Sequence, residues 1–227
     1  MINELLEVKF VGWTATPRMP FVLSGNALCL PVPTYSLLLG VIGCCLGRNV
    51  ESKEVKIGFK YDFESSNNDL ETRQRLEFDG KKIKNHSKGS DAYNREFHAN
   101  PTLTIWINRT DWMEYFTNPI GTPSLGRSQD ILKIEYAKIA KVQSVKNTSV
   151  SGTMLPFNAS LKVGGQLVRL AEAFEENEMV GKGRSPTNVK LFMTIAPENN
   201  SKVEMENLFE IESETSKIGF YLHTFGN

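Results

Sequence analysis

The longest uncharged stretch of the chain runs from Arg18 to Arg48 and is mostly apolar. Pro31 and Pro33 divide it, and only about fourteen residues follow Pro33, whereas a membrane-spanning helix needs roughly 20. Thr34 is suited to capping a helix and Gly47 to ending one. The pattern therefore predicts one buried helix, from Thr34 to Leu46, that is apolar on nearly every side.

Small residues recur along this predicted helix at three- and four-residue spacing. They are Gly40, Gly43, Cys44 and Gly47. Residues at this spacing lie on one face of a helix, and small side chains allow close approach to a neighbouring element. We expect this stripe to lie against a sheet.

Alternating apolar and polar positions predict strands on either side of the helix. The alternation runs through residues 6–10, 57–63 and 102–108, and it is clearest in the second, where Ile57, Phe59, Tyr61 and Phe63 alternate with polar residues or glycine. This second strand is expected to have one solvent-exposed face. A short helix is expected from Asp111 to about Thr117, and a further strand within residues 131–145.

Residues 64–100 interrupt the strands with a long polar segment. It contains Asp79-Gly80, a dipeptide typical of hairpin turns. A polar, basic segment of this length inside a folded chain is usually functional or disordered. We interpret it as a protruding basic hairpin or loop.

The order of the predicted elements indicates an α+β fold. Strand, helix, strand, polar excursion, strand, short helix and strand suit a ferredoxin-like sheet with helices on one face. After Lys146 the strand signals recur, in residues 166–171, 189–195 and 217–222, without strong helices. The division expected is a first part, residues 1–146, that includes the excursion, and a β-rich C-terminal extension, residues 147–227.

The formal net charge is zero, with 26 basic and 26 acidic residues, which argues against a general nucleic-acid binder. The distribution is uneven, because the stretch from Arg73 to His98 holds seven basic and four acidic residues. From Glu198 to Lys217 there are six acidic residues and two lysines. The interpretations left open are basic surfaces that meet a polyanion, and solvated faces that cluster by chance.

Residue spacing indicates no metal or cofactor site. The three cysteines lie in the apolar run without a CxxC or Cys/His spacing, so reduced, buried thiols are expected. No phosphate-binding, dinucleotide or hydrolase motif is present, and the basic turn Gly181-Lys-Gly-Arg184 is too common to indicate a site. The first residues carry no secretory signal pattern, so a cytoplasmic location is expected.

Two regions carry candidate binding chemistry. His86 and His98 lie in the excursion, where either is a candidate general base for RNA cleavage, or a phosphate contact. In the loop Leu125-Gly-Arg-Ser-Gln-Asp130, Arg127 offers a fork for phosphate or guanine. A structural loop with an internal Arg–Asp pair is the alternative.

These pieces together resemble the fifth CRISPR-associated protein family, RAMP-type subunits of type I Cascade complexes, with subtype I-B the best match. The resemblance rests on TATPRMPF, LPVPTYSLLLGVIGCCLG, REFHANPTLTIWI and PIGTPSLGRSQDILKI, in that order, and covers residues 1–146. It implies an RRM-like, ferredoxin-like domain with a β-hairpin thumb at about residues 64–100. No motif after Lys146 matches, and the β-rich C-terminal extension is assigned only because members of the family carry such an extension.

The resemblance also implies a function. It indicates a non-catalytic subunit that binds the 5′ handle of the CRISPR RNA, caps the backbone assembly and docks the large subunit for antiviral DNA targeting. The implied partners are CRISPR RNA, the Cascade backbone subunits, the large subunit and, indirectly, target DNA. The residues expected at the RNA are Arg18, Arg48, Arg73, Arg75, Lys81, Lys82, Lys84, His86, Arg127, Ser128 and Gln129.

Two other functions remain open. One branch of the family cleaves precursor CRISPR RNA without metal, using a Tyr/Lys/His set. Tyr35, Lys84 and His86 are available for such a set, although no motif assigns them. The third possibility is a protein-interaction module whose acidic C-terminal region binds a partner.

Overall fold

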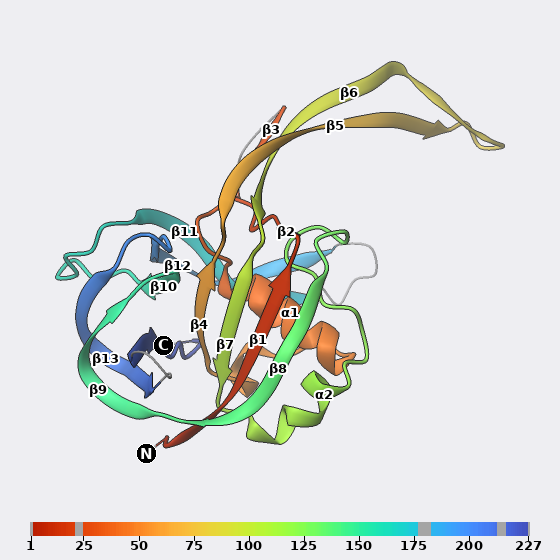
Figure 1. Cartoon of the computed structure of the whole chain (residues 1–227). Helices are drawn as coiled ribbons and strands as arrows, with labels where there is room; N and C mark the ends of the chain where they lie inside the picture. The colour runs from red at the N-terminus through yellow and green to blue at the C-terminus, as the bar shows by residue number, and fades with distance from the viewer. Residues whose placement is uncertain (1, 21–24, 177–182, 213–216, 227) are drawn as a thin grey trace.

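The computed structural model of the chain describes residues 2–20, 25–176, 183–212 and 217–226. Residues 181 and 182 of the basic turn at Gly181 and part of the acidic segment 198–217 lie outside these ranges. The described residues form a β-rich body from which one long hairpin projects (Figure 1).

A four-stranded antiparallel sheet forms the centre of the first part. Its spatial order is β4 (Ile57–Asp62), β7 (Thr102–Ile107), β1 (Glu4–Gly12) and β8 (Leu132–Lys141). Along the chain, α1 (Tyr35–Leu46) connects β1 to β4, and α2 (Met113–Thr117), preceded by a 3-10 turn (Thr110–Trp112), connects β7 to β8. Another 3-10 turn (Ser52–Glu54) follows α1.

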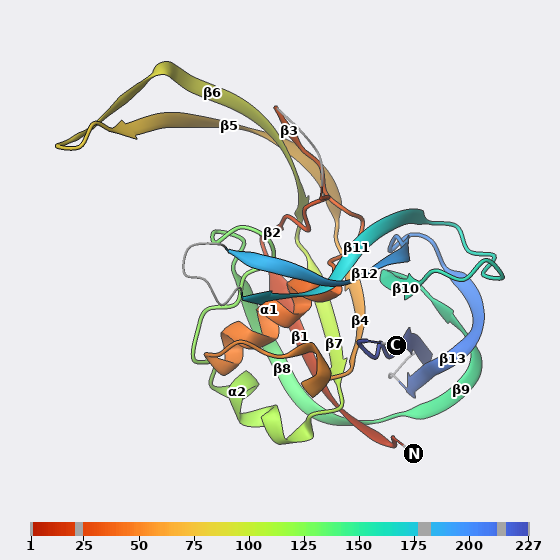
Figure 2. The ribbon, with the colours of Figure 1, turned by 180° about the vertical axis from the view of Figure 1, so that it is seen from behind.

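The central helix forms as the sequence predicts. The Thr34 side chain accepts a hydrogen bond from the Leu37 N–H at 3.2 Å, and Gly47 ends the helix in the left-handed conformation with φ 67°. The helix lies across one face of the sheet (Figure 2). Leu38 and Ile42 are fully buried, as are alternate residues of β1, β4 and β7, and all of them belong to one buried cluster. This apolar layer forms the main core.

The small-residue stripe of α1 does not face the sheet, contrary to the expectation. Gly40 is exposed, with no atom within 4 Å of the place that a Cβ would take. Gly40, Gly43, Cys44 and Gly47 line an open groove that Ile120 and Phe174 border from other elements. The large side chains of the helix gain most from burial, so they turn to the sheet. Of the small residues, Gly40 is exposed, whereas Gly43 lies close to the carbonyl of Arg48, and Cys44 and Gly47 lie against the segment Ile120–Gly121.

The exposed face expected for β4 is only partly exposed: Asp62 is exposed and Lys60 is half-buried, but the C-terminal part covers Gly58. Phe220 lies over Gly58, where an added Cβ would come within 2.5 Å of the phenylalanine ring. The Phe220 ring also stacks on Trp106 of β7, with ring centroids 4.2 Å apart. Glycine at position 58 leaves room for this ring, which the alternation pattern alone does not reveal.

The described residues of the C-terminal part form two three-stranded antiparallel sheets. One orders β10 (Thr153–Pro156), β12 (Arg184–Ile195) and β11 (Gln166–Glu176), and the other orders β14 (Lys217–Tyr221), β13 (Ser201–Glu212) and β9 (Gln143–Val150). Met154, Leu170, Phe192 and Phe225 from this part belong to the same buried cluster as α1. The two parts therefore share one core.

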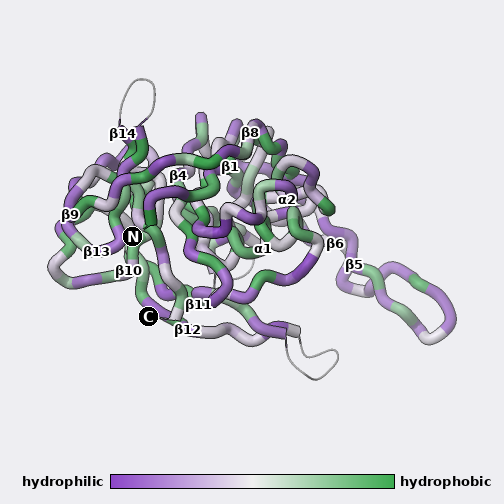
Figure 3. The backbone as a smooth tube through the Cα atoms, turned by 90° about the horizontal axis from the view of Figure 1, so that it is seen from below, coloured by the Kyte–Doolittle hydropathy of each residue, from purple (hydrophilic) through white to green (hydrophobic). Residues whose placement is uncertain are grey.

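The projecting hairpin consists of β5 (Ser65–Phe78) and β6 (Ile83–Ala99). At its base, β6 pairs with the short strands β2 (Thr14–Ala15) and β3 (Asn26–Ala27). The hairpin leaves the body and extends well beyond it, as the view from below also shows (Figure 3). No helix in the described ranges is long and apolar enough to cross a membrane.

Candidate nucleic-acid interface

The turn at the end of the hairpin is built by its own residues. Asp79 Oδ1 accepts hydrogen bonds from the N–H groups of Lys81 and Lys82, each at 3.0 Å, and Gly80 adopts φ 93°. An aspartate that bonds the backbone two residues on is a standard way to fix such a turn. The ammonium groups of Lys81 and Lys82 are consequently carried at the far end of the hairpin.

Most of the other hairpin cations are paired across or along the strands. Arg75 is paired with Asp91, Arg73 Nε lies 3.2 Å from Glu71 Oε1, and Lys84 Nζ lies 3.3 Å from Glu77 Oε1. His86 Nε2 is 3.9 Å from the other oxygen of Glu77. These exposed pairs are weak individually but reduce the local positive charge.

Three hairpin lysines are different. Within the part of the chain that the structure describes, no carboxylate lies in ion-pair distance of Lys81, Lys82 or Lys88, all exposed. Beside them are three apolar side chains, each more than half exposed. They are Leu76, Phe78 and Ile83. The far end of the hairpin thus combines free positive charge with apolar surface.

The loop at residues 125–130 is organised around the buried carboxylate of Asp130. Its Oδ1 accepts from Thr14 Oγ1 at 2.7 Å and from Arg127 Nη2 at 3.0 Å. Its Oδ2 accepts from Thr16 Oγ1 at 2.5 Å and from the N–H and Nε of Arg127 at 3.0 and 3.1 Å. Burial raises the pKa of Asp130, but these donors outweigh it, and the net effect lowers the pKa below its usual value.

Arg127 is therefore not a free fork. Its side chain is 15% exposed and is held bidentately by Asp130. The alternative that the sequence left open, an internal Arg–Asp pair, describes this geometry. What the pair does is fix the loop, so that Ser128 and Gln129 are exposed at its tip.

The loop lies directly on the base of the hairpin. Gly126 has φ 114°, and a Cβ there would overlap the backbone of Thr16, so only glycine permits this approach. The N–H of Thr16 donates to Leu125 O at 2.9 Å, and Thr14 pairs with Ala99 of β6. Segments 14–16, 98–99 and 125–130, far apart in the sequence, meet here.

An exposed tryptophan stands at this junction, which the sequence interpretation did not select. Trp13 is 86% exposed, and its carbonyl accepts a hydrogen bond from the N–H of Asn100 at 2.9 Å. The sequence shows only that Trp13 follows the first strand. Tryptophan is buried more often than not, so the pattern alone gave no reason to expect exposure.

The remaining predicted cations divide into two groups. Arg18 is exposed, and its backbone pairs with that of Cys29 in an isolated antiparallel β-bridge. The N–H of Cys29 donates to the Glu96 carboxylate of β6 at 2.8 Å, so Arg18 lies near the hairpin base. Arg48 contacts Glu54 at 2.8 Å and lies over the ring of Trp112, beyond the C-terminal end of α1. The structure does not bring Arg48 together with the other predicted residues.

The side chains that are candidates for RNA cleavage do not lie together in one site. Tyr35 is buried in the main core and donates to Met154 O at 2.6 Å, whereas Lys84 and His86 lie on the projecting hairpin. His98 is also buried, at 2.9 Å from the Tyr61 hydroxyl, and burial lowers its pKa to about 4. A histidine in this setting is part of the packing rather than a surface base.

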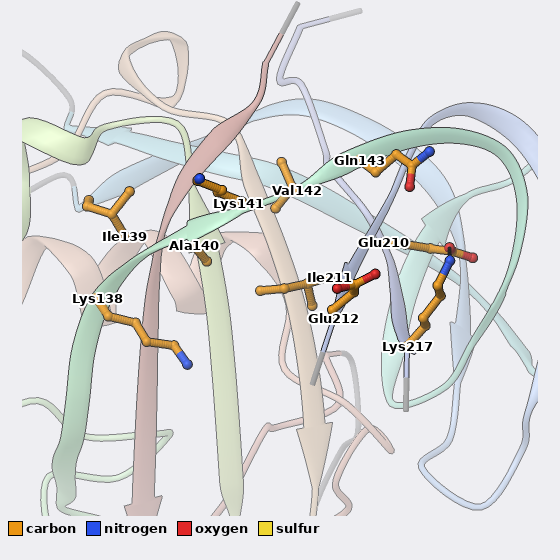
Figure 4. A pocket seen from close by; sticks show the side chains of 10 residues that line it. All are labelled: Lys138, Ile139, Ala140, Lys141, Val142, Gln143, Glu210, Ile211, Glu212 and Lys217. Carbon is orange, nitrogen blue, oxygen red and sulfur yellow. Dashed lines mark ion pairs between the residues drawn. The ribbon is translucent and has the colours of Figure 1, made fainter. Parts of the chain in front are cut away.

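A hollow elsewhere on the surface is separate from this junction. It has a volume of ≈ 400 Å³ and lies between β8 and β13, where Lys217 points toward Glu210 at 3.6 Å (Figure 4). The part of β8 that lines the hollow is its C-terminal end, which pairs with the first residues of β1, at the end of the sheet away from the hairpin (Figure 1). Among the residues that the structure describes, no group of three or more His, Cys, Asp or Glu side chains is arranged to hold a metal ion.

Comparisons with known proteins give matches in structure only. No protein-family model matches the sequence, and no curated protein matches it. A chain of a structure described as a CRISPR RNA-guided surveillance complex superposes with a TM-score of 0.59 at 13% identity, covering 88% of this chain and 91% of that one. This similarity indicates a shared fold over most of both chains.

Two further solved structures are similar over much of their length. A chain of the type III-B Cmr-beta complex bound to cognate target RNA gives a TM-score of 0.49 at 11% identity, covering 88% of this chain and 86% of that one. A CRISPR protein from Archaeoglobus fulgidus gives 0.45 at 13% identity, covering 98% of this chain and 100% of that one.

Proposed function

We propose that this chain is a non-catalytic, RNA-binding subunit of a type I CRISPR surveillance complex and holds the 5′ handle of the CRISPR RNA. The observation that carries the proposal is the fold similarity, over 88% of the chain, to a component of a CRISPR RNA-guided surveillance complex. The sequence resemblance to the fifth CRISPR-associated family, subtype I-B, agrees with it.

The topology supports assigning the first part to the RAMP type. The connection order β1, α1, β4, β7, α2, β8 and the spatial order β4-β7-β1-β8 are those of a ferredoxin-like βαββαβ sheet. In this assignment the β5–β6 hairpin corresponds to the thumb. It leaves between β4 and β7, so it extends the sheet without altering its core.

The junction at the hairpin base supports handle binding. Single-stranded RNA is recognised through unstacked bases, hydrogen bonds to their edges and cations along the phosphates. Ser128 and Gln129 offer hydrogen-bonding groups on a loop that the Arg127–Asp130 pair holds in place. Arg18 lies near the same base, and Lys81, Lys82 and Lys88 extend the positive charge outward.

The far end of the hairpin supports a role in assembly. Leu76, Phe78 and Ile83 are exposed on an element that touches little else of the chain. Exposed apolar clusters of this kind mark surfaces that a partner covers. We assign them to contacts within Cascade, with the chain capping the backbone subunits and docking the large subunit, in the cytoplasm and in antiviral defence.

The test uses the full chain and a labelled single-stranded RNA with the 5′ handle of the neighbouring CRISPR repeat. Replacing Ser128 and Gln129 with alanine is expected to weaken handle binding about tenfold, because two hydrogen bonds are lost. The matched control replaces Gln143 and Ser144, an exposed pair at the other end of the body, and is expected to bind normally. Equal affinity of both double variants would contradict the assignment.

The endoribonuclease alternative is tested with the same protein. Incubation with labelled repeat RNA in EDTA is expected to give no discrete product, because Tyr35 is buried away from Lys84 and His86. A discrete cut that His86→Ala abolishes would favour the alternative. Purification of the chain with a protein partner and without nucleic acid would favour an interaction module instead.

A further inference from the structure

Trp13 is the most exposed large apolar side chain in the described part of the molecule, at 86%. The other two tryptophans, Trp106 and Trp112, are 1% and 4% exposed. Leaving an indole in water forgoes the large gain in free energy that its burial provides. Such a position on a folded segment indicates a surface that a ligand or a partner covers.

The backbone around Trp13 is fixed, although its side chain is uncovered. The N–H of Gly12 donates to Pro101 O at 3.0 Å, and the carbonyl of Trp13 accepts from Asn100 N–H at 2.9 Å. Thr14 is bonded through its side chain to Asp130 at 2.7 Å and pairs with Ala99. Trp13 is therefore part of a rigid junction rather than of a loose terminus, so little order has to be gained on binding.

The surface around this junction is mainly polar. Asn100, whose N–H donates to the Trp13 carbonyl, is exposed, and Ser128 and Gln129 are exposed on the loop that Asp130 ties to the neighbouring Thr14. Ile131, 53% exposed, is the other large apolar side chain exposed on the described segments 12–16, 98–101 and 125–131. A protein hot spot is usually a packed apolar centre within a rim, whereas a nucleobase offers one flat apolar face and polar edges. An isolated indole beside amide and hydroxyl groups suits the base.

We propose that Trp13 is a stacking platform for one unpaired base of single-stranded RNA, whose edge faces the Ser128–Gln129 loop. This inference rests on the proposed RNA-binding function and specifies a site for it that does not depend on phosphate charge. Stacking tolerates any base, so Trp13 contributes affinity, and the loop contributes the choice of base.

The intrinsic fluorescence of the full chain tests the platform directly. Because Trp106 and Trp112 are buried, quenching by acrylamide reports mainly on Trp13. Addition of a short single-stranded RNA with the handle sequence is expected to shield Trp13 from acrylamide. An RNA duplex, whose bases remain stacked and paired, is expected to shield it much less.

Substitutions separate stacking from charge. Trp13→Ala is expected to weaken RNA binding about 5- to 150-fold and Trp13→Phe by no more than about threefold, since phenylalanine keeps a stacking face. In Trp13→Ala the slope of log affinity against log salt is expected to stay unchanged, because no phosphate contact is lost. Phe157→Ala, at an exposed aromatic residue of the C-terminal part, is the matched control and is expected to bind normally.

The outcomes distinguish the inference from the proposed function. If wild-type protein binds the RNA, while Trp13→Ala binds it equally well and acrylamide quenching does not change, the platform is refuted and RNA binding stands. If the wild-type chain binds no RNA, both are refuted. Shielding of Trp13 by added complex subunits but not by RNA also overturns the platform and assigns this face to a protein contact.

Discussion

Arg127 and Asp130 form a bidentate ion pair in which Nη2–Oδ1 and Nε–Oδ2 are 3.0 and 3.1 Å apart. The carboxylate is completely buried, while the guanidinium lies at the surface with 15% of the side chain exposed. The guanidinium of Arg127 therefore binds a carboxylate of the protein itself and is not available as a bidentate donor to a ligand. Its contribution to binding is to hold the loop, and a variant of Arg127 changes the fold locally before it changes any RNA contact.

Arg127→Met is expected to lower the free energy of unfolding by roughly 3 kcal/mol, because it leaves a buried carboxylate without its cation. Urea denaturation at pH 7 measures this change. Ser128→Ala, one residue away and exposed, is the control and is expected to change the stability by less than about 0.5 kcal/mol. A loss in Arg127→Met as small as in the control would show that the pair is not a stabilising feature.

His98 makes the stability depend on pH in mildly acidic solution. Burial lowers its pKa from 6.5 to about 4, so between these values the unfolded chain binds a proton that the folded chain does not. Stability therefore falls as the pH drops through this window, by about 2 kcal/mol from pH 7 to pH 5. The pKa of Asp130 is lowered, so the stability that its ionised carboxylate provides is lost only at still lower pH.

Urea denaturation of wild type and His98→Gln at pH 7 and pH 5 tests this dependence. The variant is expected to lose less stability between the two pH values than the wild type. Some dependence remains in the variant, because burial also lowers the pKa of His223. An identical change in both proteins would mean that His98 is not responsible.

The local elements of the fold are predictable from the sequence because their signals are local. Thr34 and Gly47 mark both ends of α1, and the turn at Asp79-Gly80 lies where the dipeptide indicates. The alternation at 57–63 gives β4. In each of these cases a cap, a turn residue or a period of two determines the conformation without help from distant residues.

Long-range contacts explain what the sequence did not predict. Phe220 covers Gly58 on the face of β4 that the alternation marks as exposed, and the hydroxyls of Thr14 and Thr16 donate to Asp130, more than 100 residues away in the sequence. Neither partner is visible in the pattern around the residue it contacts. Trp13 shows the opposite case, a residue typical of cores that the fold leaves uncovered. Pairings across the chain decide each of these positions.

Lys81, Lys82 and Lys88, which have no carboxylate partner among the residues that the structure describes, are expected to contact RNA phosphates. Replacing Lys81, Lys82 and Lys88 with glutamine is expected to weaken binding and to reduce the slope of log affinity against log salt by about 2, since each single-strand contact contributes roughly 0.7. Fluorescence anisotropy over a salt series measures the slope. Lys141, Lys146 and Lys202, exposed lysines of the body away from the junction, provide a control variant of equal charge change. The same slope in both variants would remove the hairpin from the RNA path.

The two parts of the chain on either side of Lys146 are expected not to fold independently of each other. Met154, Phe192 and Phe225 from the C-terminal part complete the core around α1, and Phe220 stacks on Trp106 of the central sheet. A fragment of residues 1–146 would expose these surfaces and is expected to aggregate or to lack a cooperative transition.

The full chain is expected to unfold in one transition, and Phe220→Ala is expected to destabilise it by about 3–5 kcal/mol. Calorimetry and urea denaturation measure both properties. Two separate transitions in the full chain, or a fragment 1–146 with a cooperative transition of its own, would show that the parts are independent domains despite the core that they share.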